Sequence, residues 1–310
     1  MSRDPPTSVL LPTTAWTPAI EEVADQLGPS DELLVICDSP SDPIADDVSE
    51  EGDGVRLVIA GEPAGCSGKA NAIAAGMETA SHDRIVWTDD DFHHPDDWLE
   101  TLLSAYDRHG PTTEVPLFVG RDPLAILFEP QYVLGGTAGV YFCDIAWAGA
   151  VVFERSDLPD EEAFRRDLKT TVADDGLLSE RVDVTPVKRV RRVEVGGTLR
   201  ETLERHVRFV QIVRRHTPAG IALSAAVAVC ATVSGVVFPL PTFVLVTALF
   251  AVLYATFGIR RWTFLLAYPS AMVTVPFLAY GLLRRTFVWG GRRYRWRSLF
   301  DVEIVEGRLD

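Results

Sequence analysis

Lysine is nearly absent from this 310-residue chain: only Lys69, Lys169 and Lys188 occur, and arginine makes up the rest of its 29 basic residues. Aspartate and glutamate number 44, so the formal net charge is −15 at pH 7. Such a charge repels the phosphate backbone of a nucleic acid. We therefore exclude nucleic acid as the main partner of this protein.

Cysteine is also scarce, and its four residues are scattered without the spacing of a metal site. We expect them to be reduced structural thiols. Internal repeats and low-complexity linkers are absent from the sequence, apart from an acidic loop over 39–54.

Residues 1–6 lack the apolar core of roughly 7–15 residues that marks a signal peptide. The acidic part of the chain is therefore expected to stay in the cytoplasm.

Charge is unevenly distributed along the chain. Residues 1–216 carry 40 acidic and 20 basic side chains, whereas residues 217–310 carry 4 and 9. The acidic part has the composition of halophilic proteins, in which salt screens the repulsion between carboxylates; tuning for solubility alone would give the same composition. The change of sign predicts a catalytic-type domain over 1–216, an apolar region over 217–285 and a basic, aromatic tail over 286–310.

A run of 41 residues without one charged side chain, 219–259, dominates the C-terminal part. Two prolines divide it into segments 219–238 and 241–259, each close to the roughly 20 residues that a helix needs to cross a bilayer. A third apolar segment spans 262–283. Three such segments in succession indicate insertion into a membrane, although buried helices of a soluble domain could share this composition.

Arginine pairs at 214–215 and 260–261 flank the first two segments, which favours a hairpin with both ends in the cytoplasm. If the third segment also crossed, the arginine-rich stretch 292–297 would lie outside, against the positive-inside tendency. Pro269 and Pro276 leave room for a broken or re-entrant segment. We predict a multi-pass protein of the cell membrane with a cytoplasmic tail, and a plain three-span protein is the alternative.

The acidic part alternates short apolar runs with helix-like spacing. Thr17-Pro18 supplies an N-cap position and a first-turn proline to one helix, and Ser67 can cap the next. This alternation predicts an α/β domain with a mixed, mostly parallel sheet that helices cover on both faces. We expect strands over 8–11, 33–37, 55–60, 85–88 and 151–154, and helices over 18–27, 69–80 and 95–109.

Three consecutive carboxylates, Asp89, Asp90 and Asp91, follow the strand predicted over 85–88. Like charges at one strand end repel one another unless a cation lies among them. Oxygen ligands of this kind suit Mg²⁺ or Mn²⁺, and such an ion can neutralise a diphosphate leaving group. A solvated acidic turn that caps the following helix would also explain them. His93 and His94 are interpreted as loop residues, because adjacent side chains point apart.

Taken in order, several motifs resemble family-2 and family-21 glycosyltransferases with the GT-A fold, above all the ceramide-glucosyltransferase-like branch. The likeness covers about residues 7–216, and the apolar part matches that branch in layout. In place of the branch's Gln/Arg-x-x-Arg-Trp, this chain has phenylalanine at the last position. The motifs are Ser8-Val-Leu-Leu-Pro12, Val35-Ile-Cys-Asp38, Gly68-Lys69-Ala-Asn71, Asp89-Asp-Asp91, Asp174-Asp175-Gly-Leu-Leu-Ser-Glu-Arg181 and Arg205-His-Val-Arg208-Phe209.

The resemblance implies a donor site made by Pro12, Asp38, Lys69 and Asp89. Asp38 would accept hydrogen bonds from the nucleotide base, and Lys69 would face the diphosphate. Asp91 would contact the Mg²⁺ or Mn²⁺ ion, and Asp89 would lie at the ribose or at the metal. Asp38 could instead be a turn residue, and Lys69 a solvated surface cation.

The resemblance also implies Asp175 as the general base, with Arg205 and Arg208 at the diphosphate or along the acceptor path. A free aspartate has a pKa near 3.9, so it is ionised at neutral pH and can take a proton from a hydroxyl. Trp147 and Phe209 would lie on the acceptor side. Alternatives are a helix-capping role for Asp175, membrane anchoring for the arginines and core packing for Trp147.

We therefore expect a metal-dependent, inverting glycosyltransferase that moves a sugar from a nucleotide-diphosphate donor to a lipid acceptor, with UDP-sugars favoured. A polyprenyl-phosphate sugar synthase shares the fold and the donor chemistry. A non-catalytic, membrane-tethered nucleotide-sugar-binding protein is the alternative from another class, although binding alone would not require Asp175.

Overall fold

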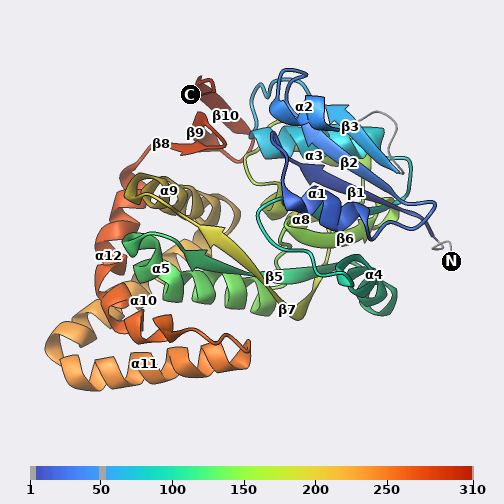
Figure 1. Ribbon diagram of the computed structural model, residues 1–310. Coiled ribbons are helices and arrows are strands. Elements are labelled where there is room, and N and C mark those ends of the chain that lie inside the picture. The colour runs from blue at the N-terminus through green and yellow to red at the C-terminus, as the bar shows by residue number, and fades with distance from the viewer. Residues whose placement is uncertain (1–4, 49–53, 309–310) are drawn as a thin grey trace. The chain divides into compact units, whose positions relative to one another are not determined.

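A computed structural model describes residues 5–48 and 54–308 (Figure 1). Residues 1–4, 309–310 and, within the acidic loop 39–54, residues 49–53 lie outside these ranges. The chain divides into two compact units. The first comprises Met1–Pro116, Val140–Arg191 and Leu299–Glu303; the second comprises Leu117–Gly139, Arg192–Ser298 and Ile304–Asp310.

A seven-stranded sheet organises the first unit, in the order β3-β2-β1-β4-β6-β5-β7. Strands β1 to β4 run parallel to one another, whereas β6 runs antiparallel to both β4 and β5. The predicted mixed, mostly parallel sheet is therefore confirmed. The strands are β1 (Thr7–Pro12), β2 (Glu32–Cys37), β3 (Val55–Ile59), β4 (Arg84–Thr88), β5 (Thr112–Gly120), β6 (Ala150–Glu154) and β7 (Thr185–Val195).

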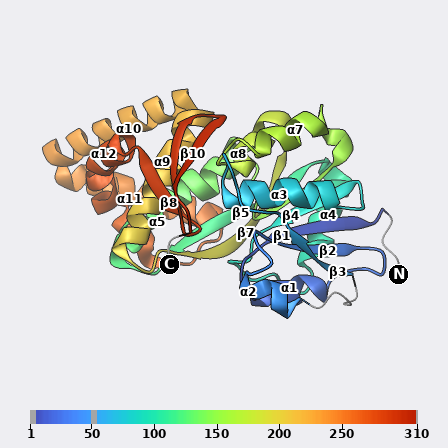
Figure 2. The same cartoon turned by 90° about the horizontal axis from the view of Figure 1, so that it is seen from above.

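Helices cover both faces of this sheet. Figure 2 shows α1 and α2 on one side of strands β1 to β3 and α3 on the other. Gly76 lets α3 approach closely, because a Cβ atom there would lie 2.4 Å from the Cδ1 atom of Ile36. The helices are α1 (Pro18–Ala24), α2 (Pro43–Asp47), α3 (Gly68–Thr79), α4 (Trp98–His109), α6 (Gly139–Phe142), η2 (Arg155–Asp157), α7 (Glu161–Leu168) and α8 (Asp174–Arg181).

Helix starts follow the sequence signals only in part. Ser67 caps α3 as predicted, since its hydroxyl accepts a hydrogen bond from the N–H of Ala70 at 3.0 Å. The side chain of Thr17 makes no cap hydrogen bond to α1. The prediction that a helix begins at Pro95 was wrong: the Trp98 N–H bonds the Pro95 carbonyl in a turn, and α4 begins at Trp98. The acidic loop also contains the short helix α2.

The second unit is mostly helical. Asp122 caps its first helix, α5, by accepting hydrogen bonds from the N–H groups of Leu124 and Ala125. Helix α9 begins with a capping box between Thr198 and Glu201. Its helices are α5 (Pro123–Tyr132), η1 (Val133–Ala138), α9 (Leu199–His216), α10 (Pro218–Val237), α11 (Pro239–Thr256), η3 (Trp262–Leu266) and α12 (Ala267–Leu283).

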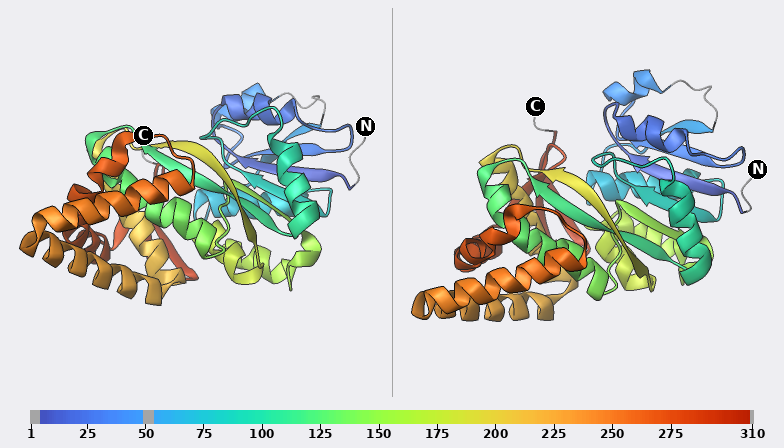
Figure 3. Two further views of the ribbon diagram at one scale, coloured as in Figure 1. Left: turned by 90° about the horizontal axis from the view of Figure 1, so that it is seen from below. Right: turned by 60° about the horizontal axis from the view of Figure 1, so that its bottom comes forward.

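Within the described ranges, three helices are long and apolar enough to cross a membrane: Pro218–Val237, Pro239–Thr256 and Trp262–Leu283. They match the three predicted apolar segments, and the third begins as the 3₁₀ turn η3 before α12. Figure 3 shows α10 and α11 side by side. Large apolar side chains such as Leu223, Val236 and Leu240 are exposed on this pair. Large exposed apolar surfaces mark sites of interaction with a membrane or with another protein.

The tail forms a small three-stranded sheet of β8 (Thr286–Trp289), β9 (Arg292–Ser298) and β10 (Asp301–Glu306). Strand β8 packs against α9, the helix that precedes the apolar region, and Arg215 near the end of α9 donates to the Trp296 carbonyl of β9. The Val288 N–H donates to the Glu204 carboxylate at 2.9 Å, and the Arg208 guanidinium lies 4.2 Å from the ring centre of Trp289. The two ends of the apolar region therefore pack against each other.

Candidate active site

The three carboxylates Asp89, Asp90 and Asp91 directly follow β4, at the carboxyl end of the parallel strands, where ligands bind in open α/β sheets. They do not share one environment. Asp91 is exposed, Asp89 is half-buried, and Asp90 is hydrogen-bonded to Thr13. Burial raises the pKa of Asp90 above its usual value, since the Thr13 hydrogen bond only partly opposes it. Asp91 is therefore the most exposed of the three carboxylates.

Lys69, in the first turn of α3, lies among carboxylates. Its ammonium group forms an ion pair with Asp89 and lies 3.7 Å from Oδ2 of Asp174. Burial alone would lower the pKa of Lys69, but Asp174 and Asp89, with a smaller contribution from Asp175, raise it above the usual value. The anion that a cation requires at this end of a helix is thus already supplied by the protein.

Asp174 and Asp175 open helix α8 and differ in exposure. Asp174 is buried, and burial raises its pKa to about 6; Lys69 opposes this shift, and Asp175 and Asp89 reinforce it. Within the described part of the chain, Oδ2 of Asp174 accepts no hydrogen bond. Asp175 is half-exposed, and its Oδ1 atom accepts a 2.7 Å hydrogen bond from the Gly176 N–H. The charge on this buried oxygen is balanced by the Lys69 ammonium group.

The predicted donor-binding residues Pro12 and Asp38 lie at the ends of two neighbouring strands. Pro12 ends β1 and is paired in register with Ile36 of β2. Asp38 follows β2 and is buried. Its N–H and that of Ser39 both donate to Oδ2 of Asp42, at 3.0 Å each. The turn role of this segment is therefore present.

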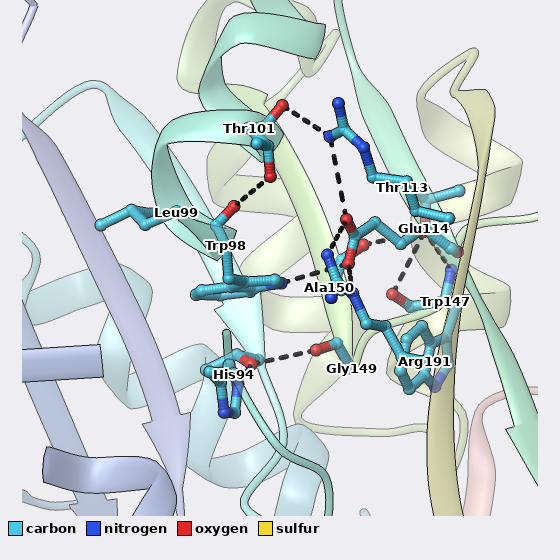
Figure 4. Close-up of polar contacts among 12 residues, drawn as sticks. His94, Trp98, Leu99, Thr101, Thr113, Glu114, Trp147, Gly149, Ala150 and Arg191 are labelled. Atoms are coloured by element: carbon cyan, nitrogen blue, oxygen red, sulfur yellow. Dashed lines mark hydrogen bonds and ion pairs between the residues drawn. The ribbon is translucent and has the colours of Figure 1, made fainter. Parts of the chain in front are cut away.

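Trp147 lies in the turn before β6 and is held by a buried network that sequence analysis missed (Figure 4). The hydroxyl group of Thr113 accepts from the Trp147 N–H and lies 3.1 Å from the Ala150 carbonyl. The indole covers Gly149, where a Cβ atom would lie 2.2 Å from a ring carbon. Only glycine therefore permits this position of Trp147.

Next to this turn, the fully buried Glu114 accepts hydrogen bonds from Arg191 and from the Trp98 indole (Figure 4). Arg191 binds through both Nε and Nη2, a bidentate arrangement that satisfies a buried charge. No sequence signal links these residues, since Glu114 and Arg191 lie 77 positions apart. The network joins α4, β5 and β7 to one another through Trp98, Glu114 and Arg191.

A second connection runs from the Trp147 turn to α8. The Ser179 hydroxyl accepts from the Ala146 N–H at 2.9 Å and donates to the Asp175 carbonyl at 2.7 Å. The predicted acceptor-side turn and the predicted general base are therefore tied together through one serine. This serine lies within the motif that carried the family resemblance, but its role was not visible from spacing.

His94 is also buried, with 1% of its surface exposed. Its Nε2 atom lies 2.7 Å from the Thr88 hydroxyl, which also lies 3.0 Å from the Gly149 carbonyl. Because a carbonyl can only accept, Thr88 donates to Gly149 and His94 Nε2–H donates to Thr88. Burial lowers the pKa of His94 to about 4, against the attraction of Glu22. His94 is thus a neutral structural group.

The expectation that the two histidine rings point apart needs correction. Nδ1 of His93 lies 2.8 Å from one carboxylate oxygen of Glu22, and Nδ1 of His94 lies 3.5 Å from the other. Both rings therefore approach the same carboxylate of α1. Together with the hydrogen bond from the His94 N–H to Glu22, these contacts hold the loop after β4 against α1.

Arg205, Arg208 and Phe209 belong to the second unit. Arg205 and Arg208 lie on one face of α9, as predicted, with guanidinium carbons 6.0 and 5.4 Å from the ring centre of Phe209. Arg208 is buried and also stacks on Trp289 of the tail. Phe209 packs against Phe118 and Tyr132. These residues form an aromatic and cationic cluster within the second unit.

The structure thus brings Lys69, Asp89, Asp174 and Asp175 together in the first unit. Among the described residues, no group of three or more His, Cys, Asp or Glu side chains is placed to hold a metal ion. Mg²⁺, however, is usually bound by one or two carboxylates, with substrate phosphates and water as further ligands. Asp91 and Asp89 fit this smaller requirement.

Part of the sequence that contains these residues matches a known protein family. Residues 17–132 match the model of glycosyl transferase family 2. This region is a family-2 glycosyl transferase segment. It contains Asp38, Lys69, Asp89 and Asp91, and it ends before Trp147, Asp175 and the α9 cluster. The resemblance inferred from the motifs is confirmed at the level of the family, whereas the ceramide-glucosyltransferase-like branch is not.

Similar solved structures include a mycobacterial protein, with 17% identity over 61% of this chain and a TM-score of 0.37. Glucosyl-3-phosphoglycerate synthase from Mycobacterium tuberculosis, in complex with Mn²⁺, UDP-glucose and phosphoglyceric acid, shows 18% identity over 68% of this chain and a TM-score of 0.40. The matches span 64% and 79% of those chains, so less than two thirds of the first is covered. No curated protein matches the sequence. Sequence identities and TM-scores this low do not identify a donor or an acceptor for this chain.

Proposed function

We propose that this protein transfers a sugar from a nucleoside-diphosphate donor to a membrane lipid, with inversion at the sugar carbon. The observation that carries this proposal is the convergence of Lys69, Asp89 and Asp174 at the carboxyl end of the parallel strands, within and beside a family-2 glycosyl transferase segment. Helices α3 and α8 and strand β4 each contribute one charged group to this point. Their common position supports a site for a charged, phosphate-bearing substrate.

Donor binding would rest on Asp38 and Pro12 for the nucleotide and on Lys69 for the diphosphate. Because Lys69 is already paired with Asp89, a diphosphate would compete with this carboxylate for the ammonium group. Asp91 and Asp89 would then hold Mg²⁺ or Mn²⁺, which would neutralise charge on the leaving group. Before substrate binds, the positive charge of Lys69 would thus reduce the repulsion between the carboxylates of Asp89 and Asp174.

Asp175 would act as the general base. Its Oδ1 atom is used by the Gly176 N–H, and its other oxygen remains to receive a proton from the acceptor hydroxyl. That hydroxyl oxygen would form the new bond to the anomeric carbon as the bond to the diphosphate breaks, so the configuration would invert. Trp147, tied to α8 through Ser179, would bound the acceptor side.

A lipid acceptor is supported by the three apolar helices of the second unit, because they would hold the protein at a bilayer surface. The phosphate of a polyprenyl carrier would attack the anomeric carbon through an oxygen that is already deprotonated at neutral pH. Either acceptor keeps the donor chemistry unchanged. Extracted lipids and polyprenyl phosphate, tested in parallel with a panel of nucleotide sugars that begins with UDP-sugars, would separate the two.

The contacts of α9 with β8 and β9 support a cytoplasmic tail. Helix α9 precedes the apolar helices and the two strands follow them, and the Arg215 guanidinium donates to the Trp296 carbonyl. Three complete crossings would place these partners on opposite sides of a membrane. To keep these partners on one side, the hairpin of α10 and α11 would cross the membrane, and the segment Trp262–Leu283 would enter it without crossing.

The first test uses the full chain in detergent and measures nucleotide affinity by calorimetry, with and without Mn²⁺. We expect Asp91→Ala to weaken the metal-dependent affinity about tenfold or more, as loss of a metal ligand does, and to abolish sugar transfer. Asp96→Ala, an exposed carboxylate in the same loop, is the matched control and should behave as wild type. An unchanged metal-dependent affinity in Asp91→Ala would remove Asp91 from the metal site.

A further inference from the structure

An open hollow of about 620 Å³ lies at the C-terminal end of α11. The last turns of α11, the connection Gly258–Arg261 and the first residues of η3 line it. All of these belong to the second unit, and none takes part in the candidate active site. Helix α11 is labelled in Figure 1. The hollow lies where the apolar sequence ends and two arginines begin.

One of these arginines is fixed. Arg261 donates through Nε and Nη2 to Glu129 of α5, the second bond measuring 2.9 Å, and Thr263 donates to the same carboxylate at 2.5 Å. Glu129 is fully buried, so its charge is balanced by Arg261. The pair therefore anchors one wall of the hollow without adding net charge to it.

The other arginine carries the net charge. Arg260 is exposed, and within the described ranges it makes no ion pair or hydrogen bond with any side chain. At the end of α11, the carbonyl groups of Leu253, Tyr254 and Ala255 accept hydrogen bonds from the backbone N–H groups of Phe257, Ile259 and Gly258. The hollow thus presents one uncompensated cation.

The remaining wall is apolar and aromatic. Ala251 and Ala255 line it from α11, and Phe264 lines it from η3. The Trp262 side chain, at the rim, is 59% exposed. Exposed tryptophan beside arginine at the end of an apolar helix is typical of the membrane–water interface. A soluble anion would use the arginine alone, whereas a ligand with both an anionic head and an apolar chain would use both walls.

We propose that this hollow binds the phosphate head group of an anionic lipid. Arg260 pairs with the phosphate, and the first part of an acyl or polyprenyl chain lies against Ala255, Trp262 and Phe264. The site is separate from sugar transfer, and it fixes the depth at which the end of α11 sits in the bilayer. It holds whether or not the proposed glycosyl transfer is correct.

The test measures binding of dioctanoyl phosphatidylglycerol to the full chain in an uncharged detergent at low salt, by calorimetry. Loss of one basic contact to an anionic lipid corresponds to ~1 kcal/mol, so Arg260→Gln should bind about fivefold more weakly. Arg285→Gln, an equally exposed arginine at the end of α12, should change the affinity less than about twofold. Equal losses in both variants would show diffuse attraction and overturn the proposal.

Two further measurements address the ligand itself. Inorganic phosphate should fail to displace the lipid; displacement would mean that the hollow recognises free phosphate and not a lipid. Ala255→Phe should fill the hollow without changing charge, so it should weaken lipid binding while far-ultraviolet circular dichroism stays unchanged. Wild-type affinity in Ala255→Phe would place the lipid outside the hollow.

Discussion

At the scale of single residues, the site depends on one lysine among several carboxylates. Asp89, Asp174 and Asp175 all act on Lys69, and like charges so close together are costly without a cation. Lys69 is one of three lysines in the chain. A lysine ammonium is a compact point charge with three rotatable donors, so it can exchange a carboxylate partner for a phosphate. That exchange is the step that donor binding would require.

Substitution of the proposed base separates binding from chemistry. Asp175→Asn keeps the size of the side chain and an oxygen for the Gly176 N–H, so donor binding should persist. Transfer should fall by roughly 10²–10⁴, the usual contribution of a general base. Single-turnover transfer and nucleotide affinity are measured on the same preparation, with the exposed Asp183→Asn as control. Near-wild-type transfer in Asp175→Asn would leave this residue only a capping role.

His94 gives a prediction about stability and pH. Its pKa is lowered from 6.5 to about 4 by burial, so the unfolded chain takes up a proton near pH 6.5 that the folded chain refuses until near pH 4. The stability that this neutral histidine contributes is complete above pH 6.5 and is lost as the pH falls toward 4. The loss is on the order of 3 kcal/mol at 1.36 kcal/mol per pKa unit.

Thermal unfolding between pH 7.5 and 4.5 measures this effect. His94→Gln should be less stable at pH 7.5, because the buried contact with Thr88 changes, but its stability should fall less steeply with acid. His93→Gln is the matched control, since that side chain is 73% exposed, and it should keep the wild-type slope. An identical slope in His94→Gln and wild type would mean that His94 does not resist protonation.

At the scale of elements, sequence reasoning succeeded where the signal was local. Strands β1 to β4 were predicted to within one residue at each end from apolar runs, and the cap of α3 was predicted from Ser67. Strands β5 and β7 were not predicted, because β5 contains the buried Glu114, whose partner Arg191 is remote in sequence. The start of α4 was misplaced because Pro95 and two acidic residues suit a turn as well as a first helical turn.

The candidate site divides in the same way. Lys69, Asp89 and Asp175 came from ordered motifs, and the structure brings them together with Asp174. The groups that position them, such as Ser179, His94 and Glu114, depend on contacts between distant segments that spacing cannot reveal. A buried polar group indicates its partner only after folding places the two together.

The contact between α5 and the start of η3 is an element-scale feature that can be tested. Arg261→Met leaves the buried Glu129 carboxylate without its cation, and removal of one partner from a buried pair costs roughly 3–5 kcal/mol. We expect a clearly lower unfolding temperature in detergent, whereas Arg260→Met should have little effect. Replacing both partners, in Glu129→Leu with Arg261→Met, should restore much of the loss. No loss in Arg261→Met would show that the pair does not hold η3 to α5.

At the scale of the whole molecule, the distribution of charge and the contacts of the tail bear on membrane topology. Acidic residues gather before residue 216, and the arginines of the C-terminal part gather at the ends of the apolar helices and in β9. Arginine near the cytoplasmic face gains from anionic lipid. In the structure, His216 at the end of α9 also lies against Trp296 of β9, with ring centres 5.9 Å apart. Both observations favour one side of the membrane for α9 and the tail.

A cysteine introduced at Ser298, an exposed position at the end of β9, tests this topology in intact cells. Both variants lack the exposed Cys230. One variant keeps the exposed Cys143 of the first unit as the reporter of the cytoplasmic side. In the other variant, Cys143 is replaced by serine. Helix α9 and strand β9 lie on either side of the apolar region in the sequence, and they contact each other. We therefore expect a membrane-impermeant thiol reagent to label neither cysteine until the cells are permeabilised. Labelling of Ser298→Cys in intact cells, with Cys143 still protected, would require an odd number of crossings and therefore a third complete span over Trp262–Leu283.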